Sequence, residues 1–332
     1  MPYRLGTATP HKSVGPVRRV LQYAFYDWTR EMPRSRRIIT WAGLLIQVYA
    51  VYAGLVGSLI WPLVWPKRWA LLALIVWVMY GVASGIMSVM LTSEFVRKTQ
   101  LEGDQIAARQ IQQTLQPQNW APVPGYEIAT FYQPFRDVGG DYFDVIELDG
   151  GRMLFAIVDV SGKGMPAALL AANVQALVRS IASTAASPLE FAHKINLHLN
   201  RYTPSDRFAT AVFAVLDSSS GQLAYVNAGH NPPVLSCGNS TCMLNATGVP
   251  LGLMSEANYE TGTIHIPPRG MLLLFTDGLT DSIEGNDPEE RISNALQSDA
   301  ATAINKLKAL MNPKFSQDDV TLLLVQRAAA SA

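Results

Sequence analysis

Two long uncharged runs near the start of the chain limit its fold more than any other feature. Ile38 to Pro66 and Trp69 to Ser93 contain no charged side chain, and only Lys67 and Arg68 separate them. A helix rises about 1.5 Å per residue, so crossing about 30 Å of hydrocarbon takes roughly 20 apolar residues. Each run exceeds that length. The pattern predicts a transmembrane helical hairpin over residues 38–93, after an N-terminal segment at 1–37.

Two other interpretations of these runs fit the sequence less well. The first run is not typical of a cleaved signal peptide. About 37 residues precede it, no small-residue cleavage site follows it, and a second span comes directly after it. Two buried core helices rarely show uninterrupted apolarity on every face. Tryptophans also gather around the turn, at the depth where amphipathic rings favour the headgroup layer: Trp61, Trp65 and Trp69.

Charge predicts the orientation of this hairpin. The basic residues on its outer flanks are Arg30, Arg34, Arg36, Arg37, Arg97 and Lys98. The turn has only two, so both termini are expected in the cytoplasm, with the chain a multi-pass protein of the inner membrane. The whole chain balances 26 basic against 26 acidic residues, which gives no field that favours nucleic acid as a partner.

A polar connector follows the hairpin. Residues 94–117 lack proline until Pro117, and Ala107, Ile111 and Leu115 form one apolar stripe, so we expect a single helix here. The stripe is shorter than three heptads. Pairing of two copies through the connector, or through small residues at four-residue spacing in the hairpin, therefore stays open, as does a role as a passive spacer.

Residues 118–327 have the texture of a globular domain, and a short tail occupies 328–332. Strand-like runs are YEIATFYQP, YFDVIEL, RMLFAIVDV, FATAVFAVLD, QLAYVNAGH, GMLLLFTDG and DVTLLLVQR. Helical patterns cover 165–185, 188–201 and 289–311, the last as two helices. Strands and helices do not alternate strictly, which favours an α+β sandwich over a doubly wound sheet. Cys237 and Cys242 are interpreted as ordinary loop thiols.

Aspartates stand at the ends of several of these strands. Asp159 ends one apolar run before Ser-Gly-Lys-Gly, Asp277 ends another before Gly278, Asp141 follows two glycines, and Asp318 opens the last strand. A carboxylate at the end of a buried strand is costly unless a positive charge neutralises it. Because these segments contain few basic residues, a divalent cation is the predicted partner, and all-oxygen ligands favour Mg²⁺ or Mn²⁺ over zinc.

Six motifs in order resemble those of one bacterial family. They are VGGDYFD (138–144), DVSGKGMPAAL (159–169), FATAVFAVLD (208–217), YVNAGHNPP (225–233), TDGLTD (276–281) and DDVTLLLV (318–325). The family is the metal-dependent protein phosphatases (PPM, type 2C-like), in the branch of the sporulation stage II E protein and the stress-response sigma-factor regulators. The resemblance covers about residues 105–327 and leaves the hairpin outside.

The resemblance implies a β-sandwich flanked by helices, with two Mn²⁺ or Mg²⁺ ions at one end. By motif position Asp159 would bridge the two ions, and the backbone carbonyl of Val160 would bind one of them. Asp277 and Asp318 would complete the other site, and Asp141 would hold the first ion directly or through water. Two such cations lower the pKa of a water between them and clamp the phosphoryl oxygens for in-line attack.

Other residues near the motifs carry open alternatives. Arg136 and Lys163 are candidates for phosphate binding, against a solvated surface role. His230 is a candidate general acid, although a loop histidine bonded to backbone is the favoured interpretation. Asp319 is predicted to support the site, whereas Asp137 and Asp144 are predicted to be structural. Residues 162–164 lack the spacing of a phosphate-binding P-loop.

The sequence thus predicts a membrane-anchored phosphoserine and phosphothreonine protein phosphatase in bacterial signal transduction. The resemblance makes an anti-sigma-factor antagonist the expected phosphoprotein substrate. Two alternatives stay open: a non-catalytic phosphoprotein-binding membrane scaffold of the same fold, and a sensor whose main output is membrane-controlled oligomerisation.

Overall fold

The computed structural model describes residues 45, 47–57, 60, 67–117, 119–184, 187–238, 240–285, 287–312 and 314–329. The predicted N-terminal segment 1–37, residues 61–66 at the end of the first predicted span and the end of the tail lie outside these residues. Lys67 and Arg68, predicted to form the turn, are the first residues of a helix. The chain divides into two compact units, residues 1–99 and 100–332, which are taken one at a time below. Helix α4 (Lys67–Leu115) is unbroken and belongs to both.

The first unit contains two apolar helical segments, residues 47–57 and the first part of α4. The Gln47 side-chain amide donates to the Ser84 hydroxyl and, at 3.3 Å, to that of Ser88. Large apolar side chains such as Met79 (67% exposed) and Leu91 (64% exposed) face outward from α4. Within the described residues, Leu74–Leu115 of α4 contains an 18-residue window with a mean hydropathy of 2.0, which is apolar enough for a membrane span.

The second unit is built on two five-stranded antiparallel sheets. One has the order β1 (Tyr126–Gln133), β10 (Val320–Arg327), β9 (Met271–Phe275), β6 (Val234–Cys237) and β7 (Ser240–Met243). The other has the order β2 (Asp141–Leu148), β3 (Arg152–Val160), β4 (Ala209–Asp217), β5 (Gln222–Ala228) and β8 (Gly262–His265). We call them the β1 sheet and the β2 sheet.

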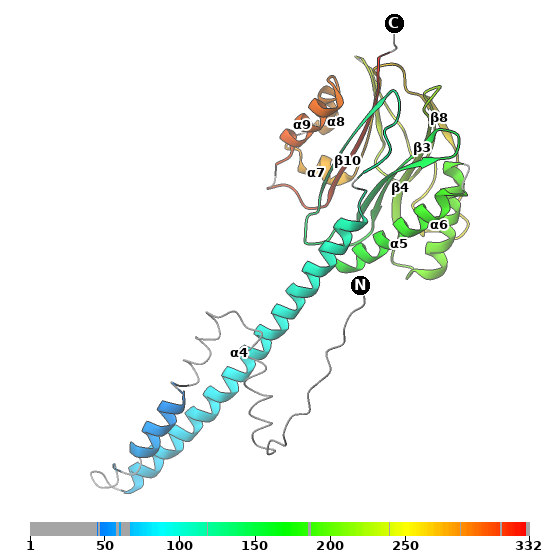
Figure 1. The fold of residues 1–332 in the computed structure, drawn as a ribbon. Helices are drawn as coiled ribbons and strands as arrows, with labels where there is room; N and C mark the ends of the chain where they lie inside the picture. Colours follow the sequence, from blue (N-terminus) through cyan, green and yellow to red (C-terminus); the bar gives the residue numbers. More distant parts are fainter. Residues whose placement is uncertain are drawn as a thin grey trace, which may run out of the picture. The chain divides into compact units, whose positions relative to one another are not determined.

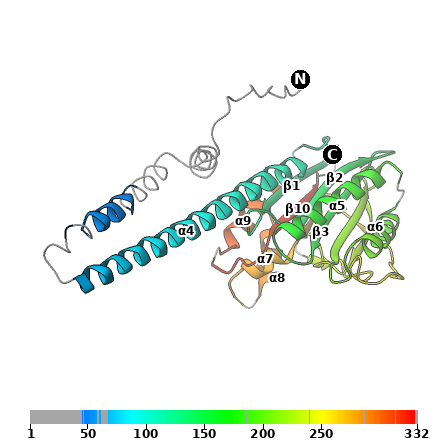
Figure 2. The same cartoon turned by 90° about the horizontal axis from the view of Figure 1, so that it is seen from below.

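Helices cover the outer faces of both sheets, as Figures 1 and 2 show. Helices α5 (Met165–Ala182) and α6 (Pro188–Tyr202) pack on the β2 sheet. Helices α7 (Asp277–Ser282), α8 (Pro288–Ala295) and α9 (Ala300–Leu310) pack on the β1 sheet. The buried carboxylate of Asp144 ties α5 to β2 through a 2.7 Å ion pair with Arg179, which confirms its predicted structural role.

Strand periodicity explains why the central strands look continuously apolar in the sequence. In β3, Leu154, Ala156 and Val158 face the helices, whereas Phe155 and Ile157 face the other sheet. Side chains alternate between the two faces of a strand, and both faces are covered here. Three apolar layers result, one between the sheets and one under each set of helices.

The predicted α+β sandwich flanked by helices is confirmed. All seven predicted strands are present, and α5, α6, α8 and α9 match the predicted helical segments. The sequence reading missed β6, β7 and β8, each of four residues, and the six-residue α7. These elements are too short to show a clear periodicity, and their places are set by the partners they pair with. Helix α5 also has the length and hydropathy of a span, but a third of it is buried as a core helix of this unit.

Candidate active site

Strand pairing in the β2 sheet brings two of the predicted aspartates together. Asp141 is the first residue of β2, and Asp159 is the next-to-last residue of β3. The two strands are antiparallel, and these two residues are direct partners in the register. On its other side Asp159 is paired with Thr210 of β4. The register therefore fixes the two carboxyl-bearing residues at one end of the sandwich.

The β1 sheet contributes its acids at the ends of β9 and β10. Asp277 follows β9 after Thr276 and begins α7, while Asp318 and Asp319 directly precede β10. Because β9 and β10 are antiparallel, with Phe275 opposite Leu322, the end of one lies beside the start of the other. We call Asp141, Asp159, Asp277, Asp318 and Asp319 the acidic edge.

Two buried threonines join the two halves of the acidic edge. The Thr276 and Thr321 hydroxyls donate to Oδ2 of Asp141 at 2.8 and 2.6 Å. Thr321 lies in β10 of the β1 sheet and Thr276 directly follows β9 of that sheet, whereas Asp141 belongs to the β2 sheet. The Thr276 hydroxyl also accepts from the Thr321 amide at 3.0 Å. The two bonds to Asp141 tie the sheets together at the end of the sandwich that carries the acidic edge.

Burial and neighbouring carboxylates raise the pKa of Asp141, Asp159 and Asp277. Burial, followed by the charges of Asp277, Asp318 and Asp319, raises the pKa of Asp159 to about 7. Burial and then the Asp159 charge raise the pKa of Asp141 well above its usual range. Burial and the Asp318 charge also raise the pKa of Asp277. Like charges close together disfavour ionisation, and a cation bound among these carboxylates would favour their ionised forms.

Asp319 supports the loop before Asp141. Its Oδ1 accepts from the Phe135 amide at 2.7 Å, and its Oδ2 accepts from the Gly140 amide at 2.6 Å. A Cβ on Gly139 would lie 2.5 Å from Oδ2 of Asp319, which explains the glycine at this position. A Cβ on Gly140 would lie 3.0 Å from the Val160 carbonyl oxygen, so that carbonyl faces the same loop.

The two basic residues predicted to bind phosphate have different surroundings. The Lys163 ammonium forms a 2.6 Å ion pair with Oδ2 of Asp318 and donates to the Gln317 carbonyl at 2.5 Å. Lys163 therefore neutralises part of the acidic edge. Arg136 is exposed, and no contact within the described residues joins it to the acidic edge.

His230 is a neutral, buried side chain. Its Nδ1 lies 2.7 Å from the Thr210 hydroxyl, and its Nε2 lies 3.1 Å from the Phe275 carbonyl oxygen. Since a carbonyl only accepts, Nε2 carries the proton and Nδ1 accepts from Thr210. Burial lowers the pKa of His230 to about 4. These contacts support the loop-histidine interpretation and link β4 to β9 beneath the acidic edge.

The end of α4 contacts the glycine loop within the second unit. The Gln112 side-chain amide donates to the Gly139 carbonyl at 2.7 Å, and its carbonyl accepts from the Gly139 amide at 3.1 Å. The Gln175 side chain of α5 donates to the Leu115 carbonyl. The last turns of the connector are thus part of the support of the site.

The donor set fits divalent cations, although no chelating cage is preformed. Within the described residues, no three Asp, Glu, His or Cys side chains are arranged to enclose a metal ion. The Asp141 carboxylate accepts hydrogen bonds from threonine hydroxyls, and the Asp319 carboxylate accepts them from backbone amides. Asp318 forms an ion pair with Lys163. All the donors are nevertheless oxygens, and one lysine faces a cluster of carboxylates that oppose one another's ionisation. Mg²⁺ and Mn²⁺ satisfy such a set.

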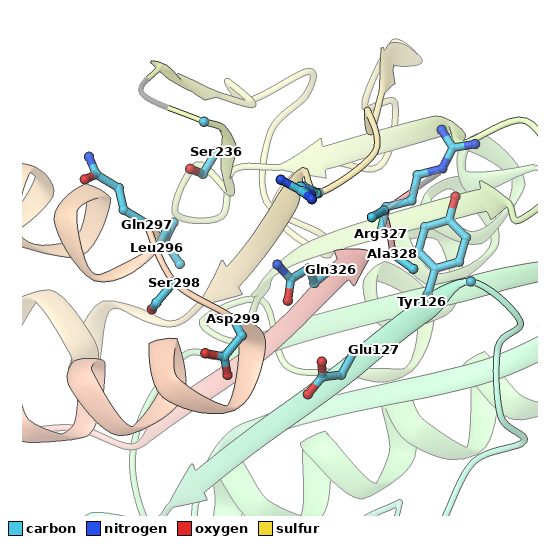
Figure 3. A pocket seen from close by; sticks show the side chains of 14 residues that line it. Tyr126, Glu127, Ser236, Leu296, Gln297, Ser298, Asp299, Gln326, Arg327 and Ala328 are labelled. Atoms are coloured by element: carbon cyan, nitrogen blue, oxygen red, sulfur yellow. The ribbon is translucent and has the colours of Figure 1, made fainter. Parts of the chain in front are cut away.

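A separate pocket lies at the opposite end of β1 and β10. It has a volume of about 740 Å³ and is lined by Tyr126, Glu127, Arg269, Asp299 and Arg327, among others (Figure 3). Tyr126 is paired with Arg327, whereas the acidic edge begins before Val320 at the other end of β10. The pocket therefore belongs to a different part of the sandwich.

Sequence analysis missed the residues that contact the acidic edge or its glycine loop from distant positions in the chain. Thr276, Thr321 and Gln112 have contacts 135, 180 and 27 residues away in the chain. The only local signal was a threonine one or two residues from an aspartate in TDG and DDVT. Arg207, whose guanidinium lies against the loop after Asp159, had no signal at all.

Comparisons with known proteins agree with this site. The family model for stage II sporulation protein E (SpoIIE) matches residues 149–328. Phosphoserine phosphatase RsbU of Bacillus subtilis is 26% identical over 231 residues, 66% of this chain and 69% of RsbU. Protein IcfG of a Synechocystis strain is 29% identical over 204 residues, 52% of this chain and 32% of IcfG. The chain therefore spans about a third of IcfG.

A solved structure gives the same result. The RsbU and RsbW domains of a Mycobacterium tuberculosis protein have a TM-score of 0.56 and 28% identity, covering 63% of this chain and 62% of that one. The family model includes Asp159, Asp277 and Asp318, and Asp141 lies just before it. A match over more than half of the chain, which includes Asp159, Asp277 and Asp318, shows that the chain belongs to the stage II sporulation protein E (SpoIIE) family.

Proposed function

We propose that this chain is a metal-dependent protein phosphatase that hydrolyses phosphoserine and phosphothreonine in other proteins. The observation that carries the proposal is the acidic edge, in which strand ends from two sheets place mutually repelling carboxylates around Asp159. Membership of the family and the likeness to RsbU, which is named a phosphoserine phosphatase, support it.

The residues proposed to hold the cations are those predicted from the motifs. Asp159 would be shared between two ions, the Val160 carbonyl and Asp141 would serve one, and Asp277 and Asp318 the other. Bound Mn²⁺ or Mg²⁺ would supply the positive charge that activates water and stabilises the phosphoryl oxygens. Binding at Asp318 competes with Lys163, whose ammonium now occupies one of its oxygens.

The surrounding side chains keep these donors in place. Thr276 and Thr321 both donate to Oδ2 of Asp141. Because the carboxyl group is rigid, these two bonds also set the direction of its other oxygen, Oδ1. Asp319 holds the Gly139–Gly140 loop through two amides. His230, which is neutral near pH 7, serves this arrangement as a link between strands.

We further propose that the chain is a multi-pass inner-membrane protein with its second unit in the cytoplasm. The apolar part of α4 supports one span. The first predicted span lies partly outside the described residues. An anti-sigma-factor antagonist is the proposed substrate, on the strength of the family resemblance. A homodimer through the connector stays a hypothesis.

The test uses the full chain purified in detergent. We expect release of phosphate from a phosphoserine peptide only with Mn²⁺ or Mg²⁺, and loss of at least a hundredfold in kcat for Asp159→Ala and Asp277→Ala. Asp287→Asn is the matched control, because Asp287 is exposed and caps α8 without a side-chain bond. A folded wild-type chain that is inactive with every metal would favour the non-catalytic scaffold.

A further inference from the structure

A dianionic phosphoryl group needs a cationic partner that the acidic edge does not itself supply. Within the described residues, the candidates considered from the segments that contain or flank the strand-end aspartates are Arg136, Lys163 and Arg207. Lys163 already neutralises Asp318 at 2.6 Å, and Arg136 is exposed without a described contact to the edge. Of these three residues, Arg207 is therefore the candidate for binding the phosphoryl group.

Strand register places Arg207 beside the loop that follows Asp159. In the β3–β4 pair Asp159 is opposite Thr210 and Val160 is opposite Ala209. The pairing continues beyond the strands, since the Ser161 amide donates to the Phe208 carbonyl at 2.9 Å. The Phe208 amide in turn donates to the Ser161 hydroxyl at 3.0 Å. Arg207 comes next and leaves this pair at the end of the sandwich that carries the acidic edge.

The loop is shaped around the Arg207 guanidinium. Nη1 of Arg207 donates to the Ser161 carbonyl at 3.0 Å. Gly162 has a φ of +100°, and a Cβ there would lie 2.1 Å from Nη1. Any other residue at 162 would thus displace the guanidinium. The carboxylate of Asp206 is 3.9 Å from Nε and is largely exposed, so this ion pair is weak.

We propose that Arg207 contacts the phosphoryl group of the bound substrate. One N–H is fixed on Ser161, and within the described residues Nη2 makes no hydrogen bond, which leaves part of the planar fork for an anion. A guanidinium already held in place loses little side-chain freedom on binding. This inference rests on the proposed function, because it names the phosphate-binding residue of the same site.

The test measures binding of inorganic phosphate to the full chain in detergent by calorimetry with Mg²⁺ present. KM and kcat for p-nitrophenyl phosphate are measured on the same samples. We expect Arg207→Ala to weaken phosphate binding and raise KM at least tenfold, with the Mg²⁺ concentration for half-maximal activity unchanged. Arg201→Ala is the matched control, since this exposed arginine of α6 lies against Tyr202.

A second variant separates phosphate binding from loop support. Arg207→Gln keeps an N–H donor for Ser161 but removes the charge, so it should lose phosphate affinity while retaining the wild-type melting temperature. If Arg207→Ala fails to fold, the glutamine variant alone tests whether Arg207 binds phosphate. Phosphate affinity within twofold of wild type in the folded glutamine variant, or a change confined to the Mg²⁺ requirement, would overturn the proposal.

The outcome distinguishes this inference from the proposed function. If the wild type binds phosphate through Arg207 but hydrolyses no phosphoester, the phosphatase proposal fails and the arginine site stands. If the wild type hydrolyses a phosphoester and the arginine variants bind phosphate normally, only the arginine site fails. A wild type that binds no phosphate at all refutes the arginine site.

Discussion

Neutralising Asp159 should stabilise the metal-free protein, and increasingly so as the pH rises. Burial and neighbouring carboxylates raise the folded-state pKa of Asp159 from its ordinary value of 3.8 to about 7. The folded protein therefore holds this proton up to about pH 7, while the unfolded chain releases it near 3.8. Stability is lost as the pH rises through that window.

The magnitude follows from the width of the window. At about 1.36 kcal/mol per pH unit, the shift from 3.8 to about 7 costs the metal-free wild type about 4 kcal/mol at pH 8. At pH 5 the cost is about 1.6 kcal/mol, because only the interval above 3.8 has been crossed. Asp159→Asn keeps the shape and removes the titration. We expect it to exceed the wild type by these amounts, or by about 10 °C in Tm at pH 8.

The assay is thermal and urea unfolding of both full-length proteins in detergent with a chelator, at pH 5 and pH 8. Comparison at each pH removes the contribution of His230, whose lowered pKa affects both proteins equally. Asp217→Asn is the control, because hydrogen bonds from Ser219 and Ser220 lower the pKa of Asp217 to about 2 and keep it ionised throughout. Adding Mg²⁺ at pH 8 should stabilise the wild type more than Asp159→Asn. A difference between the proteins that is the same at both pH values would refute the reasoning.

Three further outcomes test the support of the site. Thr321→Val removes a donor from the buried Asp141 and should lower the free energy of unfolding by about 1–3 kcal/mol in urea, whereas Thr321→Ser retains it. Gln112→Ala removes both bonds to Gly139 and should lower kcat/KM about tenfold, with the exposed Gln110→Ala unchanged; equal activity of the two would contradict this role. The pH profile of kcat/KM should show no limb near 6.5 from His230, and a limb there that His230→Asn abolishes would count against its neutral state.

Local sequence pattern was enough to locate the longer strands and the aspartates at their ends, but not the four-residue strands β6, β7 and β8. Apolar runs that stop at an acid and a glycine mark where a buried strand leaves the core, so Asp159 and Asp277 were identifiable without coordinates. Which strands are neighbours was not identifiable, because pairing is decided by contacts between distant segments. The direct pairing of Asp141 with Asp159, and the threonine bonds across the sheets, therefore emerged only from the fold.

Arg207 illustrates the same limit for a basic residue. Its sequence neighbours, Asp206 and Phe208, give it the look of a surface charge before a strand. Its guanidinium lies on Ser161, 46 residues earlier, and only that contact gives it a relation to the site. Lys163, which stands inside a motif, was singled out by position, but its ion pair with Asp318 could not be deduced from the motif.

The threonine contacts make the positions of the aspartates depend on how the two sheets pack against each other. Asp141 and Asp159 lie in strands of one sheet, whereas Asp277, Asp318 and both threonines lie in or directly beside strands of the other. The layer between the sheets is filled by apolar side chains such as Ile157 and Leu323. A truncation there that shifts the sheets by a fraction of an ångström would open the gap between donors while every strand stays folded. Heating and core substitutions should therefore abolish activity before they unfold the protein. Inactivating substitutions are expected in the core between the sheets as well as among the aspartates.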